Sequence, residues 1–198
     1  MLFTSKTLTK NALAAKTMFT QRCFSTKIKS IGIVGAGQMG TGIGIVAART
    51  AGLNVTMVDP SETSRHKSKA FTQNWCQKEI SKERMTDGES SDVQNRIQYT
   101  GDVDGLDKVD FVVEAVNEDF ELKKLIFKGI AQNAPDHAIL ATNTSSISIS
   151  KIGGCIPERA HQVIGMHFMN PVPVMKLVEV ITALQTDDMT LTTTTQLA

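Results

Sequence analysis

The sequence of 198 residues has little cysteine, no long apolar run and no acidic side chain before Asp59. Its three cysteines show no CxxC spacing, which argues against a disulfide framework or a zinc site, so no metal centre is predicted. The longest uncharged stretch, residues 31–48, is interrupted by glycine and polar positions, which argues against stable membrane insertion. The net charge of +1 without a downstream basic cluster gives no reason to expect nucleic acid as a partner.

The lack of acidic residues is most informative at the N-terminus. Residues 1–26 hold four basic side chains, which alternate with leucine and phenylalanine in the manner of a basic amphipathic helix. This pattern is typical of a mitochondrial presequence, which the membrane potential draws inward. We therefore predict a presequence over residues 1–26, cleavage before Ser25 and a location in the mitochondrial matrix. A tail without function is the alternative.

From residue 27 onward, short β-branched runs alternate with helical patterns, which predicts an α/β fold with a doubly wound, mostly parallel sheet. We expect strands at Lys29–Val34, Val55–Val58, Asp110–Val116, Ala138–Ala141, Val163–His167 and Leu177–Ile181. Helices are expected at Gln38–Ala51 and Phe120–Ala134. A helical hairpin is expected after the second strand, within residues 61–96, with its turn at Thr86–Gly88.

Two finer expectations concern helix faces and domain limits. In the helix at residues 120–134, Leu122, Leu125, Ile126 and Ile130 are expected to lie on one face. Residues 27–186 are expected to form one Rossmann-like domain. The threonine-rich segment 187–198 is expected to be the truncated start of a further helical domain.

The segment Gly35-Ala36-Gly37-Gln38-Met39-Gly40 is a GxGxxG motif that follows a predicted strand and opens a predicted helix. In that context, the glycines allow a tight turn, a close approach to pyrophosphate and close packing of helix on sheet. Asp59 ends the next strand, 24 residues after Gly35, where a carboxylate accepts hydrogen bonds from a ribose and repels a 2′-phosphate. The sequence therefore predicts NAD as the cofactor, although the nearby Arg65 softens the argument against NADP.

A second constellation lies in residues 165–181, where His167 ends one predicted strand and Glu179 lies within the next. Oxidation of an alcohol needs a base for the hydroxyl proton, and an imidazole exchanges protons near neutral pH. A carboxylate behind it orients the ring and stabilises its charged form. Because Glu179 lies in an apolar run, we expect it to be buried and to need His167 as its partner.

The segment Asn143-Thr-Ser-Ser146 follows the predicted strand 138–141, at the strand ends where open α/β sheets bind ligands. Its hydroxyl groups suit a substrate oxygen or the nicotinamide ribose. A helix cap for residues 148–153 explains them equally well.

These motifs, with DFVVEAV at residues 110–116 and HFMNPVPVMKLVEVI at 167–181, resemble the short-chain L-3-hydroxyacyl-CoA dehydrogenases over residues 28–185. The resemblance implies NAD-dependent oxidation of L-3-hydroxyacyl-CoA in fatty-acid β-oxidation. It implies four catalytic residues, of which His167 and Glu179 form the acid–base pair and Ser145 and Asn170 also contact substrate and cofactor. It implies further cofactor contacts by Glu118 and Lys123. For CoA it implies Lys82, together with a serine at a position where this sequence has Trp75.

The resemblance also implies a second, all-helical domain and a homodimer, and the sequence ends before that domain. Two alternatives stay open. One is a related dehydrogenase of free hydroxy acids, and the other is a non-catalytic NAD-binding fragment.

Overall fold

The computed structural model describes residues 28–198, so the predicted presequence lies outside the described residues. The strands are β1 (Ser30–Val34), β2 (Asn54–Val58), β3 (Ile97–Thr100), β4 (Phe111–Glu114), β5 (Ile139–Thr142), β6 (Val163–Phe168) and β7 (Val178–Thr182). The helices are α1 (Gln38–Arg49), α2 (Glu62–Ser81), α3 (Asp87–Arg96), α4 (Phe120–Asn133), α5 (Ile149–Gly153) and α6 (Asp188–Leu197). Two 3-10 helices, η1 (Val103–Leu106) and η2 (Pro157–Gln162), complete the elements.

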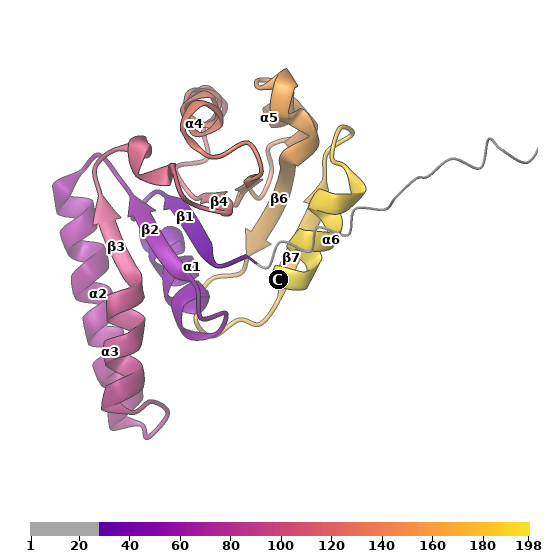
Figure 1. Ribbon diagram of the computed structural model, residues 1–198. Helices are drawn as coiled ribbons and strands as arrows, with labels where there is room; N and C mark the ends of the chain where they lie inside the picture. The colour runs from indigo at the N-terminus through magenta and orange to yellow at the C-terminus, as the bar shows by residue number, and fades with distance from the viewer. Residues whose placement is uncertain (1–27) are drawn as a thin grey trace, which may run out of the picture.

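The strands form one seven-stranded sheet in the order β3-β2-β1-β4-β5-β6-β7 (Figure 1). Every neighbouring pair is parallel except β6 and β7, which are antiparallel. The chain thus winds from β1 to one edge and then returns to build the other half. This arrangement confirms the predicted doubly wound, mostly parallel α/β fold and its helical hairpin, α2–α3, after the second strand.

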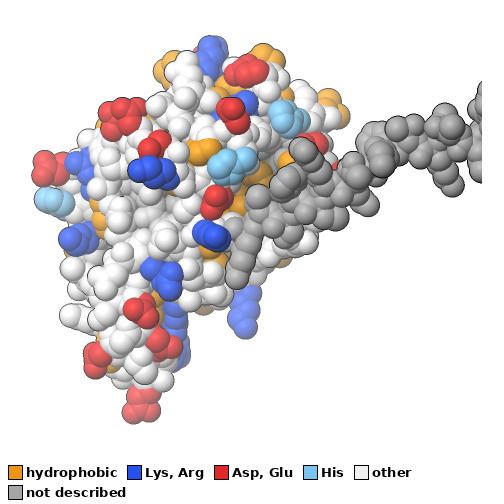
Figure 2. Space-filling model, viewed as in Figure 1, with side chains coloured by type: hydrophobic (Ala, Val, Ile, Leu, Met, Phe, Trp, Pro, Cys, Tyr) orange, Lys and Arg blue, Asp and Glu red, His pale blue; other side chains and the backbone are white. Residues whose placement is uncertain are grey.

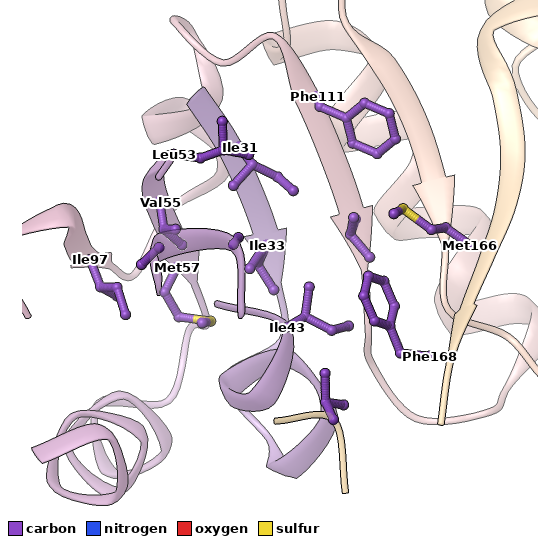
Figure 3. Packing of buried hydrophobic residues seen from close by; sticks show 14 of the residues in the cluster. Ile31, Ile33, Ile43, Leu53, Val55, Met57, Ile97, Phe111, Met166 and Phe168 are labelled. Carbon is purple, nitrogen blue, oxygen red and sulfur yellow. The ribbon is translucent and has the colours of Figure 1, made fainter. Parts of the chain in front are cut away.

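Two hydrophobic clusters cover the two faces of the sheet, which makes three layers. One cluster joins strand residues such as Ile33 and Phe168 to Ile43 of α1 (Figure 3). It also receives side chains of α2, α3 and α6. The other joins the opposite face to Phe127 of α4 and Ile152 of α5. Central strands are buried on both sides, which explains their almost continuous runs of β-branched residues.

The turn of the helical hairpin lies elsewhere than the sequence predicts. Thr86 is the N-cap of α3 and forms a capping box with Glu89, so the predicted turn at 86–88 is wrong and the turn lies earlier. Residues 97–100, which continue the polar hairpin in sequence, form strand β3 beside β2. A Thr86 hydroxyl followed three residues later by glutamate is a helix start signal, and it takes precedence over the glycine at 88.

The buried face of α4 is not the apolar face that the sequence indicates. The fully buried side chains are Lys123, Phe127 and Ile130, spaced four and three residues apart. Leu122 is exposed, and Leu125 is 68% exposed. Lys123 lies on the buried face, where its Nζ contacts the carboxylates of Glu114 and Glu118.

Helix α6 packs on the sheet beside β6 and β7, with Thr190 and Thr194 fully buried. The predicted domain boundary after residue 186 stays a prediction. Among the described residues, no helix is both long and apolar enough to cross a membrane. Acidic and basic side chains alternate over the face of the described chain shown in Figure 2.

Candidate active site

Most of the predicted site residues gather at the carboxyl ends of the parallel strands. The sheet register places Val58, Val34, Glu114 and Thr142 in one row across β2, β1, β4 and β5. The segments that follow this row begin at Asp59, Gly35, Ala115 and Asn143. On the neighbouring strand β6, His167 lies two residues beyond Gly165, the partner of Thr142. The topology therefore brings distant sequence motifs to the carboxyl ends of the strands, where open α/β sheets bind ligands.

The glycine-rich turn has the geometry that its sequence predicts. Gly35 has a φ of +108°, which side chains other than glycine rarely adopt. A Cβ on Gly40 would lie 1.8 Å from the Gly35 carbonyl oxygen, so only glycine lets α1 begin this close to the turn. A Cβ on Gly37 would meet no atom within 4 Å, which leaves its backbone open to a ligand.

Helix α1 differs from the other α-helices of residues 28–198 at its N-terminus. Each of the others begins with a side-chain oxygen that accepts a backbone N–H. At α1 the N-cap is Gly37, no side chain caps the helix, and the first turn has no acidic residue. Its free N–H groups and helix dipole therefore suit an external anion. The pyrophosphate of a dinucleotide fits this cradle.

Asp59 lies beside the glycine-rich turn. Its Oδ2 accepts a hydrogen bond from the Ala36 N–H at 2.9 Å, and its Oδ1 accepts one from the Ser61 N–H at 2.9 Å. The carboxylate is thus fixed where the adenosine ribose of a dinucleotide would follow its pyrophosphate. Arg65 donates a hydrogen bond from its guanidinium to the Asp59 carbonyl oxygen. That contact ties the arginine to the backbone.

His167 and Glu179 meet as predicted. They are direct partners in the antiparallel pairing of β6 with β7, and His167 Nδ1 lies 2.8 Å from Glu179 Oε2. If Nδ1 carries the proton that this contact requires, Nε2 is left as the basic atom. The imidazole is 23% exposed, so it is accessible to a ligand while held in place by the carboxylate.

The predicted burial of Glu179 is wrong, because 52% of its side chain is exposed. Strand β7 is the edge of the sheet, and four of its five residues alternate between exposed and half-buried positions. Large apolar side chains on and around this strand are exposed as well: Leu177, Ile181, Leu184 and Met189. The apolar sequence around Glu179 therefore reflects a face that residues 28–198 leave uncovered.

Two asparagines connect the motifs to one another. Asn143 Oδ1 accepts the Phe168 N–H at 2.8 Å, which fixes the backbone directly after His167. Asn170 Oδ1 accepts a hydrogen bond from Gln38 Nε2 at 3.1 Å. The second contact places Asn170 beside the glycine-rich turn, as its predicted cofactor role requires. Sequence reasoning gave Asn143 and Gln38 no such connecting role.

Glu118 holds the segment 144–146. Its Oε1 accepts hydrogen bonds from the hydroxyl of Thr144 and from the backbone N–H and hydroxyl of both Ser145 and Ser146. Partial burial raises the pKa of Glu118, but these hydrogen bonds and the charge of Lys123 outweigh it and lower that pKa to about 2. Glu118 is therefore a carboxylate at any physiological pH.

Lys123 lies beneath Glu118, with 1% of its side chain exposed. Its Nζ lies 2.7 Å from Glu114 Oε1 and 3.4 Å from Glu118 Oε2. Glu114 is fully buried at the end of β4 and also accepts hydrogen bonds from the Val116 N–H and the Thr142 hydroxyl. Sequence reasoning missed Glu114, although a carboxylate that ends an apolar run is the signal that could have identified it.

The predicted CoA contact Lys82 lies away from the glycine-rich turn. It follows the last turn of α2 and lies 4.0 Å from Glu79. The part of α2 beside the turn is about 21 Å away along the helix, at Ser68, whose hydroxyl contacts that of Thr41 at 2.8 Å. Trp75 packs under the guanidinium of Arg49 and against the core, which explains a tryptophan there without a ligand.

Together these features define a dinucleotide-binding domain with an acid–base pair at the carboxyl ends of the same strands, which is the arrangement of an NAD-dependent dehydrogenase. Among residues 28–198, no three potential metal ligands gather to hold an ion. The chain belongs to the family described as "3-hydroxyacyl-CoA dehydrogenase, NAD binding domain", which matches residues 30–198. NAD is the cofactor of that family's domain.

Several known proteins are similar to this chain. A probable 3-hydroxybutyryl-CoA dehydrogenase of Bacillus subtilis is 41% identical over 83% of this chain and 56% of its own length. The 3-hydroxybutyryl-CoA dehydrogenase of Bradyrhizobium diazoefficiens is 39% identical over 82% of the chain and 55% of its own. The crystal structure of (S)-3-hydroxybutyryl-CoA dehydrogenase from Ralstonia eutropha has 43% identity and a TM-score of 0.82, covering 86% and 59%. The chain thus spans a little over half the length of these relatives.

Proposed function

We propose that the protein to which this chain belongs oxidises an L-3-hydroxyacyl-CoA to the 3-oxoacyl-CoA, with NAD as the hydride acceptor. The observation that carries the proposal is the 2.8 Å contact between His167 and Glu179, which lies at the same end of the sheet as the uncapped start of α1. The names of the relatives supply the acyl-CoA class. Because the chain covers only a little over half the length of these relatives, the activity is proposed for the whole protein.

The residues divide the work as follows. The turn at Gly35–Gly40 and the carboxylate of Asp59 hold the dinucleotide, which accepts a hydride when bound. His167 Nε2 takes the proton of the 3-hydroxyl group while a hydride leaves C3, the carbon that bears this hydroxyl, so a ketone forms at C3. Glu179 stabilises the imidazolium that results. Ser145 and Asn170 orient the reacting oxygen.

We further propose that the protein acts in fatty-acid β-oxidation in the mitochondrial matrix and that its complete form is a homodimer. The location rests on the basic amphipathic composition of residues 1–26. The homodimer rests on the family resemblance. It agrees with the exposed apolar side chains around β7, because soluble proteins seldom leave such a surface uncovered.

The test begins with calorimetric titration of NAD+ into the chain, where failure to bind would contradict the proposal. The rate of NADH consumption with acetoacetyl-CoA as the substrate is then compared with the rate with free acetoacetate. Preference for the CoA ester supports the proposed class, whereas equal use of free acetoacetate would place the protein among dehydrogenases of free hydroxy acids. NAD+ binding without turnover of either compound would assign this chain a nucleotide-binding role alone.

A further inference from the structure

Glu118 is predicted to touch the cofactor, and its carboxylate also has partners within the protein. The five hydrogen-bond donors around Oε1 all belong to residues 144–146, and Oε2 faces Lys123 at 3.4 Å. The Glu118 side chain is still 37% exposed, so these internal contacts do not exclude a ligand. They give this carboxylate a second role, which is to hold the turn that follows β5.

The anchor of this carboxylate is equally well defined. The Lys123 side chain is 1% exposed, and its shorter contact, at 2.7 Å, is with the buried Glu114. Glu114 in turn accepts a hydrogen bond from Thr142 at the end of β5, directly before the segment it helps to order. Glu114 thus joins the ends of β4 and β5, and the buried ammonium group of Lys123 links Glu114 to Glu118.

We propose that Glu118 is a positioning residue that fixes the turn at Ser145–Ser146 and sets the direction of the Ser145 hydroxyl. Because that hydroxyl donates its proton to Glu118, its oxygen is available to a ligand as a hydrogen-bond acceptor. In the proposed reaction, an acceptor at this place suits the 3-hydroxyl group of the substrate, which still has a proton to donate. The functional reading rests on the proposed function, but the role of Glu118 in the turn does not.

The contact from the Ser145 hydroxyl is the longest of the five. Its hydroxyl lies 3.3 Å from Oε1, whereas the Thr144 hydroxyl and the Ser145 N–H lie at 2.5 and 2.9 Å. The backbone of the turn is therefore held more firmly than the serine hydroxyl. After oxidation the hydroxyl can turn toward the ketone without release of the turn.

The experiment uses the 198-residue chain without ligand, in Glu118→Ala and Glu118→Gln forms. Glu121→Ala is the matched control, because Glu121 also lies at the start of α4 but is exposed and pairs only with Lys124. Hydrogen exchange of the Ser145 and Ser146 amides is measured by NMR. We expect Glu118→Ala to accelerate it at least about tenfold at the Ser145 amide, which loses its acceptor. A smaller acceleration is expected at the Ser146 amide, because its N–H also faces the Thr144 hydroxyl oxygen at 3.4 Å. Glu121→Ala is expected to leave it unchanged.

A spectroscopic signature separates positioning by the charge from a general loss of structure. Glu118→Gln keeps the shape and one oxygen but removes the charge, so the two amide protons are expected to shift upfield as charge-assisted hydrogen bonds become neutral ones. Side-chain couplings of Ser145 are expected to change from one rotamer to an average in Glu118→Ala. If that variant does not fold, the amide shifts of Glu118→Gln decide alone.

Unchanged amide exchange in a folded Glu118→Ala chain, equal acceleration by Glu121→Ala, or unchanged amide shifts in Glu118→Gln would each overturn the proposal. These measurements need neither NAD nor acyl-CoA. Failure of the wild-type chain to bind NAD+ would therefore count against the proposed function while leaving this inference standing.

Discussion

The buried ion pair between Lys123 and Glu114 gives the sharpest prediction about stability. The two side chains are 1% and 0% exposed, and their charged atoms lie 2.7 Å apart. In Lys123→Met the shape of the side chain is retained, but Glu114 is left as a buried carboxylate without its cation. Breaking a buried pair in this way costs about 3–5 kcal/mol, a large part of the 5–15 kcal/mol that stabilises a typical domain.

The assay is urea unfolding followed by circular dichroism. With a slope near 2 kcal/mol per molar urea, the unfolding midpoint of Lys123→Met is expected to fall by about 2 M. Lys124→Met is the matched control, because the neighbouring lysine forms only an exposed pair with Glu121, and its midpoint is expected to stay unchanged. The double variant Lys123→Met with Glu114→Gln is expected to recover more than half of the loss, because no buried charge remains unpaired.

Equal midpoints for Lys123→Met and Lys124→Met would refute this reasoning. So would a double variant that is less stable than Lys123→Met alone, because the cost would then come from lost packing and not from an uncompensated charge. A change of slope among the variants would show that the folded or unfolded state itself had changed.

Three further predictions concern the site. Gly40→Ala places a Cβ 1.8 Å from the Gly35 carbonyl oxygen and is expected to weaken NAD+ binding at least about tenfold by calorimetry. The control is Gly129→Ala in α4, whose Cβ would meet only Val103 at 4.0 Å and should leave binding unchanged. Equal affinities of the two variants for NAD+ would contradict the packing argument. His167→Gln is expected to lower kcat by about 10²- to 10⁴-fold with NAD+ affinity preserved, and a variant with unchanged kcat would remove His167 from the mechanism. Asp59→Asn removes the charge that would repel a 2′-phosphate, so NADP+ affinity should rise relative to NAD+ in parallel titrations, and an unchanged ratio would show that Asp59 does not select the cofactor.

Sequence alone was sufficient where a motif carries its own geometry. The glycines at 35, 37 and 40 predicted a strand, a tight turn and a helix in that order, and each is present. The pairing of His167 with Glu179 followed from two strands joined by a short connection, because neighbouring strands in a chain commonly pair. In both cases the residues that the predicted chemistry needs lie close together in the sequence and also fit the local backbone.

Sequence was insufficient where burial depends on distant partners. The leucines of α4 suggested one buried face, but the buried face contains Lys123, since Glu114 and Glu118 offer it carboxylates from other segments. Residues 97–100 gave little strand signal, because β3 lies at an edge of the sheet and only Ile97 is buried. The exposure of Glu179 likewise depends on what covers β7, and the residues of the strand itself carry no information on that point.

The account depends on the imidazole of His167 lying beside the nicotinamide ring of the bound dinucleotide. The most direct measurement is the nuclear Overhauser effect between nicotinamide protons and the His167 ring in the complex of this chain with NAD+. The account predicts a cross-peak between the nicotinamide C4 proton and the imidazole. Nicotinamide cross-peaks to other residues with none to His167 would contradict it.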